Sequence, residues 1–184
     1  MRRIEALRVI DEAVGAGPLV VTAGATAREL ASLARRPNHL HLLDSMGLAA
    51  AVGMGVALGH RGRVTAIEGD GSLLMGLSML ATLATAGPPN LTLVVLDNGE
   101  HASAGRVPTQ ATVLDLAAAV RGFGLPVEEC DAPDGLQAAL SAAAAGDRLA
   151  VVYARIEGGN ETGVPFLLED PAALGARFRD ALAP

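Results

Sequence analysis

The sequence predicts a single α/β domain over residues 1–184, in which helices cover both faces of a doubly wound parallel sheet. Short segments that are apolar almost throughout alternate along the chain with segments whose apolar residues recur at helical spacing. Strands of this kind are typical of parallel sheets, because both faces of such a sheet are buried. A length of 184 residues and a hydrophobic content of 51% provide for one full core.

Each element follows from a local pattern. The first helix places Ile4, Leu7 and Ile10 on one face, and Gly15 ends it. Later helices repeat this spacing, and Gly, Pro or polar residues separate them from the strands. The predicted strands are residues 19–22, 39–43, 64–67, 91–96, 127–130 and 149–156. The predicted helices are residues 4–14, 26–34, 47–59, 73–86, 113–121, 135–145 and about 171–182.

Composition excludes several classes of protein. A single cysteine, Cys130, rules out an intramolecular disulfide and argues against a Cys-rich zinc site. With 14 Lys and Arg against 20 Asp and Glu, a net charge of −6 and 2% aromatic residues, the chain has no nucleic-acid-binding footprint. No run approaches the roughly 18 apolar residues of a membrane span, and the first residues lack an apolar signal core. We therefore expect a cytoplasmic protein with no nucleic-acid partner and no membrane partner.

A candidate metal site begins where the strand 64–67 ends. Asp70 stands between Gly69 and Gly71, at the start of the next predicted helix. The glycines let the backbone approach a ligand, and the free N–H groups at the start of a helix suit a phosphate. A carboxylate beside a phosphate requires a cation, and Mg²⁺ takes oxygen ligands from both. By itself, the tripeptide more often reflects an Asp that caps a helix.

A second loop, residues 97–110, follows the next predicted strand. Asp97, Asn98 and Gly99 open this loop, and by themselves they are typical of a simple turn. The intervening helix is the crossover between the two strands, so Asp70 and Asn98 are expected at the same edge of the sheet. A carboxylate and an amide oxygen can then bind one Mg²⁺, and a backbone carbonyl past Gly99 can complete the protein ligands.

The stretch GDGSLL…PPNLTLVVLDNGEH resembles the motif of thiamine diphosphate enzymes, in which GDG and a later pair of asparagines bracket the metal and the diphosphate. Asn98 follows Asp70 by 28 residues, as in that motif, although Asp97 replaces the first asparagine. The resemblance implies a domain of the thiamine diphosphate-binding fold, with thiamine diphosphate and Mg²⁺ as cofactors. The implied metal ligands are the side chains of Asp70 and Asn98 and the main-chain carbonyl of Glu100. The implied cofactor contacts in this stretch are Gly69, Gly71, Ser72 and Asn98.

Residues 44–58 resemble the upstream segment of the same domain, where a bulky apolar residue holds the cofactor bent. This resemblance implies cofactor contacts from Ser45 and Met46, and ordinary core packing is the alternative for Met46. Over nearly the whole chain the sequence resembles the phosphonopyruvate and sulfopyruvate decarboxylases. The matching stretches include Ser45-Met46-Gly47, GDGSLLM, His101-x-Ser103 and Pro108-Thr109.

The loop after the metal motif is expected near the substrate. His101 is the candidate catalytic residue, as the donor of a hydrogen bond or a proton, and a solvent-facing loop histidine is the alternative. Arg106 could pair with a phosphonate or sulfonate through its planar fork, or it could be a surface residue. The loop departs from the family pattern at Ala102 and at Arg106-Val107, which leaves the 3-substituent of the substrate open.

The sequence accounts for the diphosphate-binding half of such an enzyme. No glutamate matches the one that contacts the aminopyrimidine ring in this family, and Glu29 is expected on a helix surface or at an interface. The resemblance therefore implies the β subunit of a split decarboxylase, active with a pyrimidine-binding α subunit in an α₂β₂ heterotetramer. Its substrate would be a small anionic 2-oxo acid, sulfopyruvate or phosphonopyruvate, which is cleaved to the aldehyde and CO₂.

Two alternatives remain open, and a third is weak. A carboligating enzyme similar to acetolactate synthase would keep the cofactor, and a non-catalytic regulatory subunit would keep the fold. A dinucleotide-binding domain is disfavoured, because no G-x-G-x-x-G follows the first strand. Outside the motifs, His39, His41 and His60 are expected to be structural or exposed, and Cys130 is expected in the core.

Overall fold

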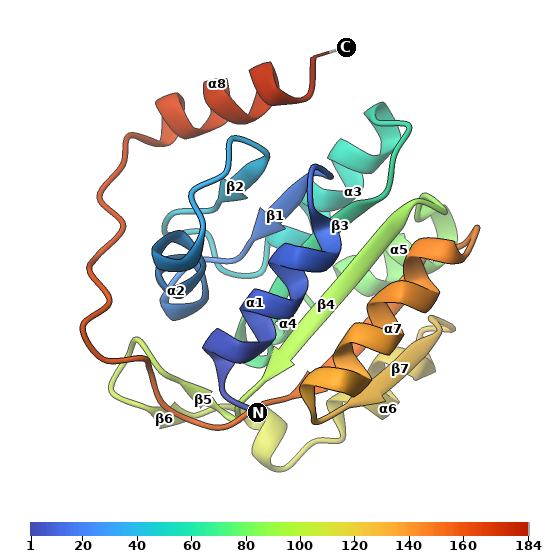
Figure 1. Ribbon diagram of the computed structural model, residues 1–184. Coiled ribbons are helices and arrows are strands. Elements are labelled where there is room, and N and C mark those ends of the chain that lie inside the picture. The colour runs from blue at the N-terminus through green and yellow to red at the C-terminus, as the bar shows by residue number, and fades with distance from the viewer. Residues whose placement is uncertain (184) are drawn as a thin grey trace.

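The computed structural model describes residues 1–183. Six strands form one sheet in the order β2-β1-β3-β4-β8-β7 (Figure 1). These strands are β1 (Leu19–Val21), β2 (His39–His41), β3 (Val64–Gly69), β4 (Leu91–Asp97), β7 (Val127–Cys130) and β8 (Ala150–Arg155). Every neighbouring pair is parallel, which confirms the predicted doubly wound α/β fold.

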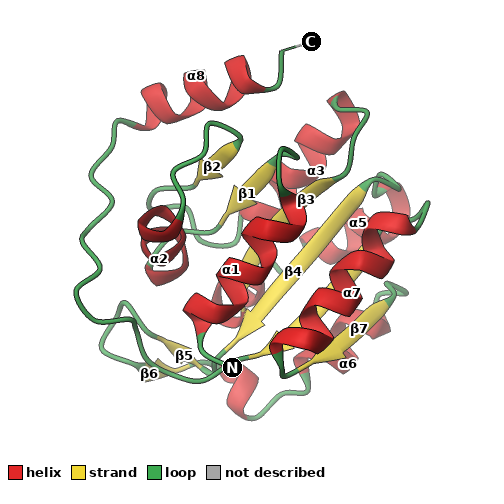
Figure 2. Cartoon of the chain, in the orientation of Figure 1, coloured by secondary structure: helices red, strands yellow, loops and turns green. Residues whose placement is uncertain are grey.

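Helices cover both faces of this sheet (Figure 2). The first face carries α1 (Arg3–Val14), α2 (Ala25–Leu33) and α7 (Pro133–Ala145). The second face carries α3 (Ala49–Gly59), α4 (Asp70–Met75), α5 (Met79–Ala86) and α6 (Leu116–Gly122). The last helix, α8 (Pro171–Ala181), contributes Phe178 to this second core and lies against the edge strand β2. The two helical layers leave the carboxyl edge of the strands free for loops.

The predicted helix 73–86 is in fact two helices, α4 and α5, which separate at Gly76. Gly76 lies against Gly47, and a Cβ on Gly76 would collide with the Gly47 carbonyl oxygen. Gly47 itself has φ +79°, so α3 begins only at Ala49 rather than at residue 47. The prediction of one continuous helix is wrong because this close backbone contact joins segments that are 29 residues apart in the sequence.

The loop 97–110 also contains more structure than the sequence predicts. It folds into an antiparallel hairpin of β5 (Glu100–His101) and β6 (Val107–Pro108), and the 3₁₀ helix η1 (Gln110–Thr112) follows. The helix expected from residue 113 begins later, at Leu116, because the Asp115 carboxylate accepts a hydrogen bond from the Ala118 N–H at 2.9 Å and caps it there.

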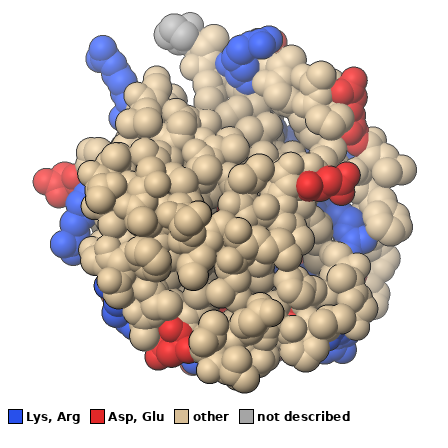
Figure 3. Space-filling model, turned by 180° about the vertical axis from the view of Figure 1, so that it is seen from behind, with Lys and Arg blue, Asp and Glu red and all other residues tan. Residues whose placement is uncertain are grey.

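The face that carries α3 and α5 is poor in charged side chains (Figure 3). Neither helix contains Asp, Glu, Lys or Arg. Near the start of α3 and the end of α4, Met46, Leu48 and Met75 are 41%, 49% and 61% exposed. Among residues 1–183, no helix combines the length and the apolar character that crossing a membrane requires.

Candidate functional site

The ends of β3 and β4 bring the two predicted motif loops together. The two strands pair directly, with Gly69 opposite Leu96, so the loops that follow them meet at the carboxyl edge of the sheet. A cleft of about 110 Å³ opens there. Its lining includes the predicted site residues Met46, Gly69, Asp70, Gly71, Ser72, Asn98, Glu100 and His101. Ser45 does not line the cleft, and its hydroxyl donates to the Leu43 carbonyl oxygen at 3.0 Å.

Asp70 is the first residue of α4 and is 2% exposed. Its Oδ2 accepts a hydrogen bond from the hydroxyl of Thr109, which follows β6. Burial raises the pKa of the Asp70 carboxyl, and the hydrogen bond from Thr109 acts in the opposite direction. A cation bound to Asp70 would offset the same cost of burial. The sequence offered no role for Thr109, because it lies 39 residues beyond its partner.

Hydrogen bonds fix the conformation of the loop that carries Asn98. The Asp97 carboxylate accepts from the Gly99 N–H at 3.0 Å and from the Tyr153 hydroxyl at 2.6 Å. Asn98 Oδ1 accepts from the Glu100 N–H at 3.3 Å. The buried Nδ2 of Asn98, however, has no hydrogen-bond partner among residues 1–183. An unpaired donor at the cleft suits a ligand that brings acceptor oxygens.

His101 lies over Gly71. A Cβ on Gly71 would collide with the His101 ring and would come within 2.9 Å of Thr109 Cγ2, so only glycine fits there. The ring is half-buried in the cleft and does not project freely into solvent. Next to it, the main-chain carbonyl of Glu100 accepts from the Ala102 N–H at 3.1 Å and keeps a second lone pair for another partner.

Arg106 lies outside the cleft. Its Nε is 2.9 Å from Glu100 Oε2, and its side chain is 64% exposed. The Glu100 carboxylate also accepts from the Gly159 N–H. Burial raises the pKa of Glu100, but the hydrogen bonds from Gly159 and Arg106 outweigh it and lower the pKa overall. Arg106 is therefore engaged in an ion pair on the hairpin, which disfavours the substrate contact considered from the sequence.

A buried network beneath the cleft involves Glu68, a residue for which the sequence suggested no role. Glu68 is 0% exposed, and its carboxylate accepts from the Ser72 hydroxyl and from the Ala50 N–H at 3.1 Å. Ser72 Oγ also lies 2.7 Å from Thr22 Oγ1 and accepts from the Gly47 N–H at 2.8 Å. Burial raises the pKa of Glu68, and these hydrogen bonds oppose the shift. Since the Ser72 hydroxyl is engaged within the protein, a cofactor contact from Ser72 would come from its main chain.

Arg3 and Glu29 form a buried ion pair at the wall of the cleft. Arg3 Nη1 is 2.7 Å from Glu29 Oε1, and the two side chains are 5% and 3% exposed. Arg3 also donates to Asn160 Oδ1 at 3.1 Å, and Asn160 donates to the Ala102 carbonyl oxygen at 2.8 Å. The expectation that Glu29 lies on a helix surface is wrong, because its partners come from α1 and from the segment after β8, both distant in the sequence.

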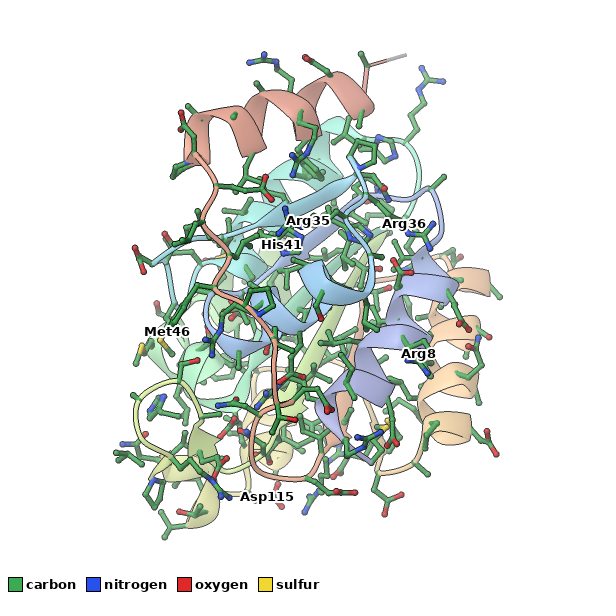
Figure 4. The ribbon with its side chains drawn as sticks, turned by 60° about the vertical axis from the view of Figure 1, so that its left-hand side comes forward. Arg8, Arg35, Arg36, His41, Met46 and Asp115 are labelled. Atoms are coloured by element: carbon green, nitrogen blue, oxygen red, sulfur yellow. The ribbon has the colours of Figure 1, made fainter. Side chains whose placement is uncertain are left out.

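The remaining histidines and the cysteine lie away from the cleft. His39 and His41, in β2, are 0% and 4% exposed, and Figure 4 shows His41 below α8 and well apart from Met46. Burial lowers the pKa of both imidazoles, that of His41 to about 4. Cys130 is half-buried, and burial raises the pKa of its thiol to about 11. A structural role fits His39 and His41, as the sequence predicts.

The oxygen donors around the cleft fit a hard divalent cation. A carboxylate, an amide oxygen and a main-chain carbonyl are ligands that Mg²⁺ accepts. Within the described part of the chain, no three His, Cys, Asp or Glu side chains are grouped to hold a metal by themselves. Further ligands would therefore come from a bound phosphate or from water, which is the usual situation for Mg²⁺.

The sequence is similar to known decarboxylases over most of its length. The chain is 38% identical over 180 residues to phosphonopyruvate decarboxylase of Streptomyces hygroscopicus, a match that covers 97% of this chain and 45% of that protein. It is 30% identical over 182 residues to sulfopyruvate decarboxylase subunit beta of Methanococcus maripaludis, covering 99% and 98% of the two chains. The corresponding subunit of Methanothermobacter thermautotrophicus is 39% identical over 127 residues, or 69% of each chain. The chain thus spans less than half the length of the Streptomyces relative.

Solved structures share the fold. A putative thiamin diphosphate-dependent enzyme of Mycobacterium smegmatis superposes with a TM-score of 0.73 at 24% identity, over 86% of this chain and 32% of that one. Benzoylformate decarboxylase of Polynucleobacter necessarius gives a TM-score of 0.74 at 18% identity, over 88% of this chain and 34% of that one. Residues 22–154 match the family described as thiamine pyrophosphate enzyme, C-terminal TPP binding domain. The chain therefore belongs to the thiamine pyrophosphate enzymes and contains their C-terminal, cofactor-binding domain.

Proposed function

We propose that residues 1–184 form one diphosphate-binding domain and that this domain is the β subunit of a Mg²⁺-dependent decarboxylase of 3-substituted pyruvates. The observation that carries the proposal is the meeting of Asp70 and Asn98 at one cleft, on loops that follow neighbouring parallel strands. The names of the relatives support the reaction and the substrate class, because they are phosphonopyruvate and sulfopyruvate decarboxylases. The substrate is then a small anionic 2-oxo acid.

Different residues of the cleft bind different parts of the cofactor. Asp70, Asn98 and the carbonyl of Glu100 bind Mg²⁺, which neutralises the diphosphate. Gly69, Gly71 and Ser72 bring main chain close to the diphosphate, and Met46 supports the thiazolium ring. Thiamine diphosphate, when bound, supplies a nucleophilic carbon and an electron sink for the loss of CO₂. His101 orients the substrate carbonyl or transfers a proton to the product.

A pyrimidine-binding α subunit completes the site. Among the described residues, the acidic side chains that line the cleft are Asp70 and Glu100. Asp70 is assigned to the metal, and Glu100 is bound to Arg106 and to the main chain of Gly159. On this proposal the glutamate for the aminopyrimidine ring comes from outside residues 1–184, and we assign it to the α subunit. The charge-poor face that carries α3 and α5, with the exposed Met46, Leu48 and Met75, offers an apolar surface for that subunit.

The test is an assay of the chain with and without a pyrimidine-binding subunit, in the presence of Mg²⁺ and thiamine diphosphate. We expect CO₂ and aldehyde from sulfopyruvate or phosphonopyruvate only in the mixture, and a mass that fits α₂β₂ by light scattering. Robust turnover by the chain alone would contradict the shared site. Formation of a carboligation product from pyruvate in place of aldehyde would indicate the acetolactate synthase type of reaction.

A further inference from the structure

Arg28, in α2, is a cation without a direct counter-ion. Its guanidinium carbon lies 4.9 Å from the centre of the Phe166 ring, and its Nη2 donates to Ser103 Oγ at 3.4 Å. No Asp or Glu oxygen within residues 1–183 comes within 4 Å of it, whereas Arg106 is paired with Glu100. The stacking contact with Phe166 holds the guanidinium plane and leaves donors of its fork available.

A second cavity, of about 250 Å³, adjoins the cofactor cleft and includes Arg28 in its wall. The two cavities share Ala23, Gly24 and Ser103. Ser103 follows His101 by two residues on the hairpin, and a Cβ on Gly24 would lie 3.2 Å from Ser103 Oγ. The second cavity therefore lies directly beside the cleft, and Gly24 and Ser103 stand between the two.

We propose that Arg28 and Ser103 form the subsite for the anionic 3-substituent of the substrate, a phosphonate or a sulfonate. This inference rests on the proposed function, and it replaces Arg106 by Arg28 as the anion-binding arginine. The planar fork of arginine donates two parallel hydrogen bonds to oxyanions of this shape, and the serine hydroxyl can add a third. Leu42 and Leu43 supply the apolar part of the wall.

Asp44 lines the same cavity, and its negative charge provides a second test of the proposal. Removing this charge should have the opposite effect to removing the charge of Arg28. Its carboxylate makes no ion pair within 4 Å in the described chain, so its charge acts on the cavity at longer range. Asp44 has φ +54°, a conformation that Asn also tolerates. Asp44→Asn therefore removes a repulsive charge without a change of backbone preference, and it should strengthen binding of an anionic substrate.

The experiment measures binding of 3-phosphonopyruvate and of pyruvate by calorimetry, with the chain assembled with its pyrimidine-binding partner and without thiamine diphosphate, so that no substrate is consumed. Arg28→Gln should weaken phosphonopyruvate binding roughly 10- to 100-fold, the range for a charge-assisted hydrogen bond, and should change pyruvate binding by no more than about twofold. Arg28→Lys keeps the charge but not the planar fork, so its affinity for phosphonopyruvate should lie between those of the wild type and of Arg28→Gln. Asp44→Asn should shift phosphonopyruvate affinity upward.

Arg8→Gln is the matched control. Arg8 is an exposed arginine of α1 that lies far from Met46 in Figure 4 and forms no ion pair in the described chain. Three results would each overturn the subsite. Arg8→Gln could lose as much affinity for phosphonopyruvate as Arg28→Gln, Arg28→Gln could keep the wild-type preference for phosphonopyruvate over pyruvate, or the wild type could fail to bind phosphonopyruvate. If wild-type enzyme binds phosphonopyruvate through Arg28 but decarboxylates no 2-oxo acid, the subsite stands and the proposed function fails.

Discussion

Two of the regions that contain buried polar side chains are the cleft at the ends of β3 and β4 and the edge strand β2 beneath α8. In the cleft, Glu68 and Asp70 each accept hydrogen bonds, and the buried atom without a partner is Asn98 Nδ2. In β2, both ring nitrogens of His39 and the Nδ1 of His41 have no hydrogen-bond partner in the described chain. His39 Nε2 lies 3.3 Å from Asp11 Oδ1 but without the geometry of a hydrogen bond.

The difference shows that an unpaired buried group can have opposite consequences. Asn98 borders a cavity, so a ligand can satisfy its free donor at no cost to the fold. The histidines of β2 are enclosed by protein, so burial makes their charged form unfavourable, lowers their pKa and ties stability to pH. The cleft is arranged for binding, whereas the β2 edge is a place where acid weakens the fold.

The metal ligands provide the largest expected effect. Asp70→Ala should abolish Mg²⁺-dependent binding of thiamine diphosphate by the assembled enzyme, and Asn98→Ala should weaken it strongly, because both remove an oxygen ligand from the cation. Calorimetry with and without Mg²⁺ measures the change. Asp115→Asn is the control, since Asp115 does not line the cleft and an amide oxygen can still accept from the Ala118 N–H. Unchanged cofactor affinity in Asp70→Ala would contradict the assignment.

The buried ion pair at the cleft wall is the next test. Glu29→Gln leaves the Arg3 charge buried without a counter-ion, which should lower the free energy of unfolding by about 3–5 kcal/mol. Urea denaturation of the chain measures this loss. The pair of Arg106 and Glu100 is the comparison, with side chains 64% and 12% exposed, and Arg106→Gln should cost less than about 1 kcal/mol because the charge that it removes lies in solvent. Similar losses in both variants would show that burial does not distinguish the two pairs.

Acid titration tests the β2 edge. Burial lowers the pKa of His41 from the ordinary 6.5 to about 4, with His39 adding to the shift and Glu169 opposing it. Between pH 6.5 and about 4, the unfolded chain therefore binds a proton at His41 that the folded chain does not. The contribution of neutral His41 to the free energy of unfolding is fully present above pH 6.5 and is lost as the pH falls toward 4. The expected loss is about 3 kcal/mol.

The variant His41→Leu should remove most of this loss, and the difference between wild type and variant isolates it from the carboxylates that titrate in the same range. Urea denaturation at pH 7 and at pH 4.5 measures it. His60→Gln, at a half-buried position outside both regions, is the matched control. Its free energy of unfolding should fall between pH 7 and pH 4.5 by the same amount as in the wild type. Identical pH slopes in wild type and His41→Leu would refute the role of His41.

Met46 gives the smallest expected effect. Met46→Leu should keep most of the activity of the assembled enzyme, because the two side chains have similar volumes. Met46→Ala should lower kcat by roughly tenfold and weaken cofactor binding less, because the ring loses its support while the diphosphate keeps its contacts. Steady-state kinetics and calorimetry separate the two quantities. Equal kcat in Met46→Ala and wild type would place Met46 among ordinary apolar contacts.

Local patterns in the sequence were sufficient for the strands and for the main residues of the cleft. The predicted segments match all six strands of the sheet. The four inner strands β1, β3, β4 and β8 are largely apolar, because both of their faces are buried, whereas the edge strands β2 and β7 contain His and Glu. The motif loops around Asp70 and Asn98 followed from their position after neighbouring strands. Each of these features depends on residues close together in the chain or on the order of the elements.

Only the tertiary structure decided the features that depend on distant contacts. Gly47 ends α4 by lying against Gly76, and Arg3 buries Glu29 from 26 residues away. Sequence reasoning considered Arg106 as the anion-binding residue, whereas the structure pairs it with Glu100 and leaves Arg28 without a counter-ion. A sequence pattern predicts which face of a helix or strand is buried, but it does not predict which side chain from another segment will pack against that face. Partners from distant segments are therefore settled only when the chain has packed.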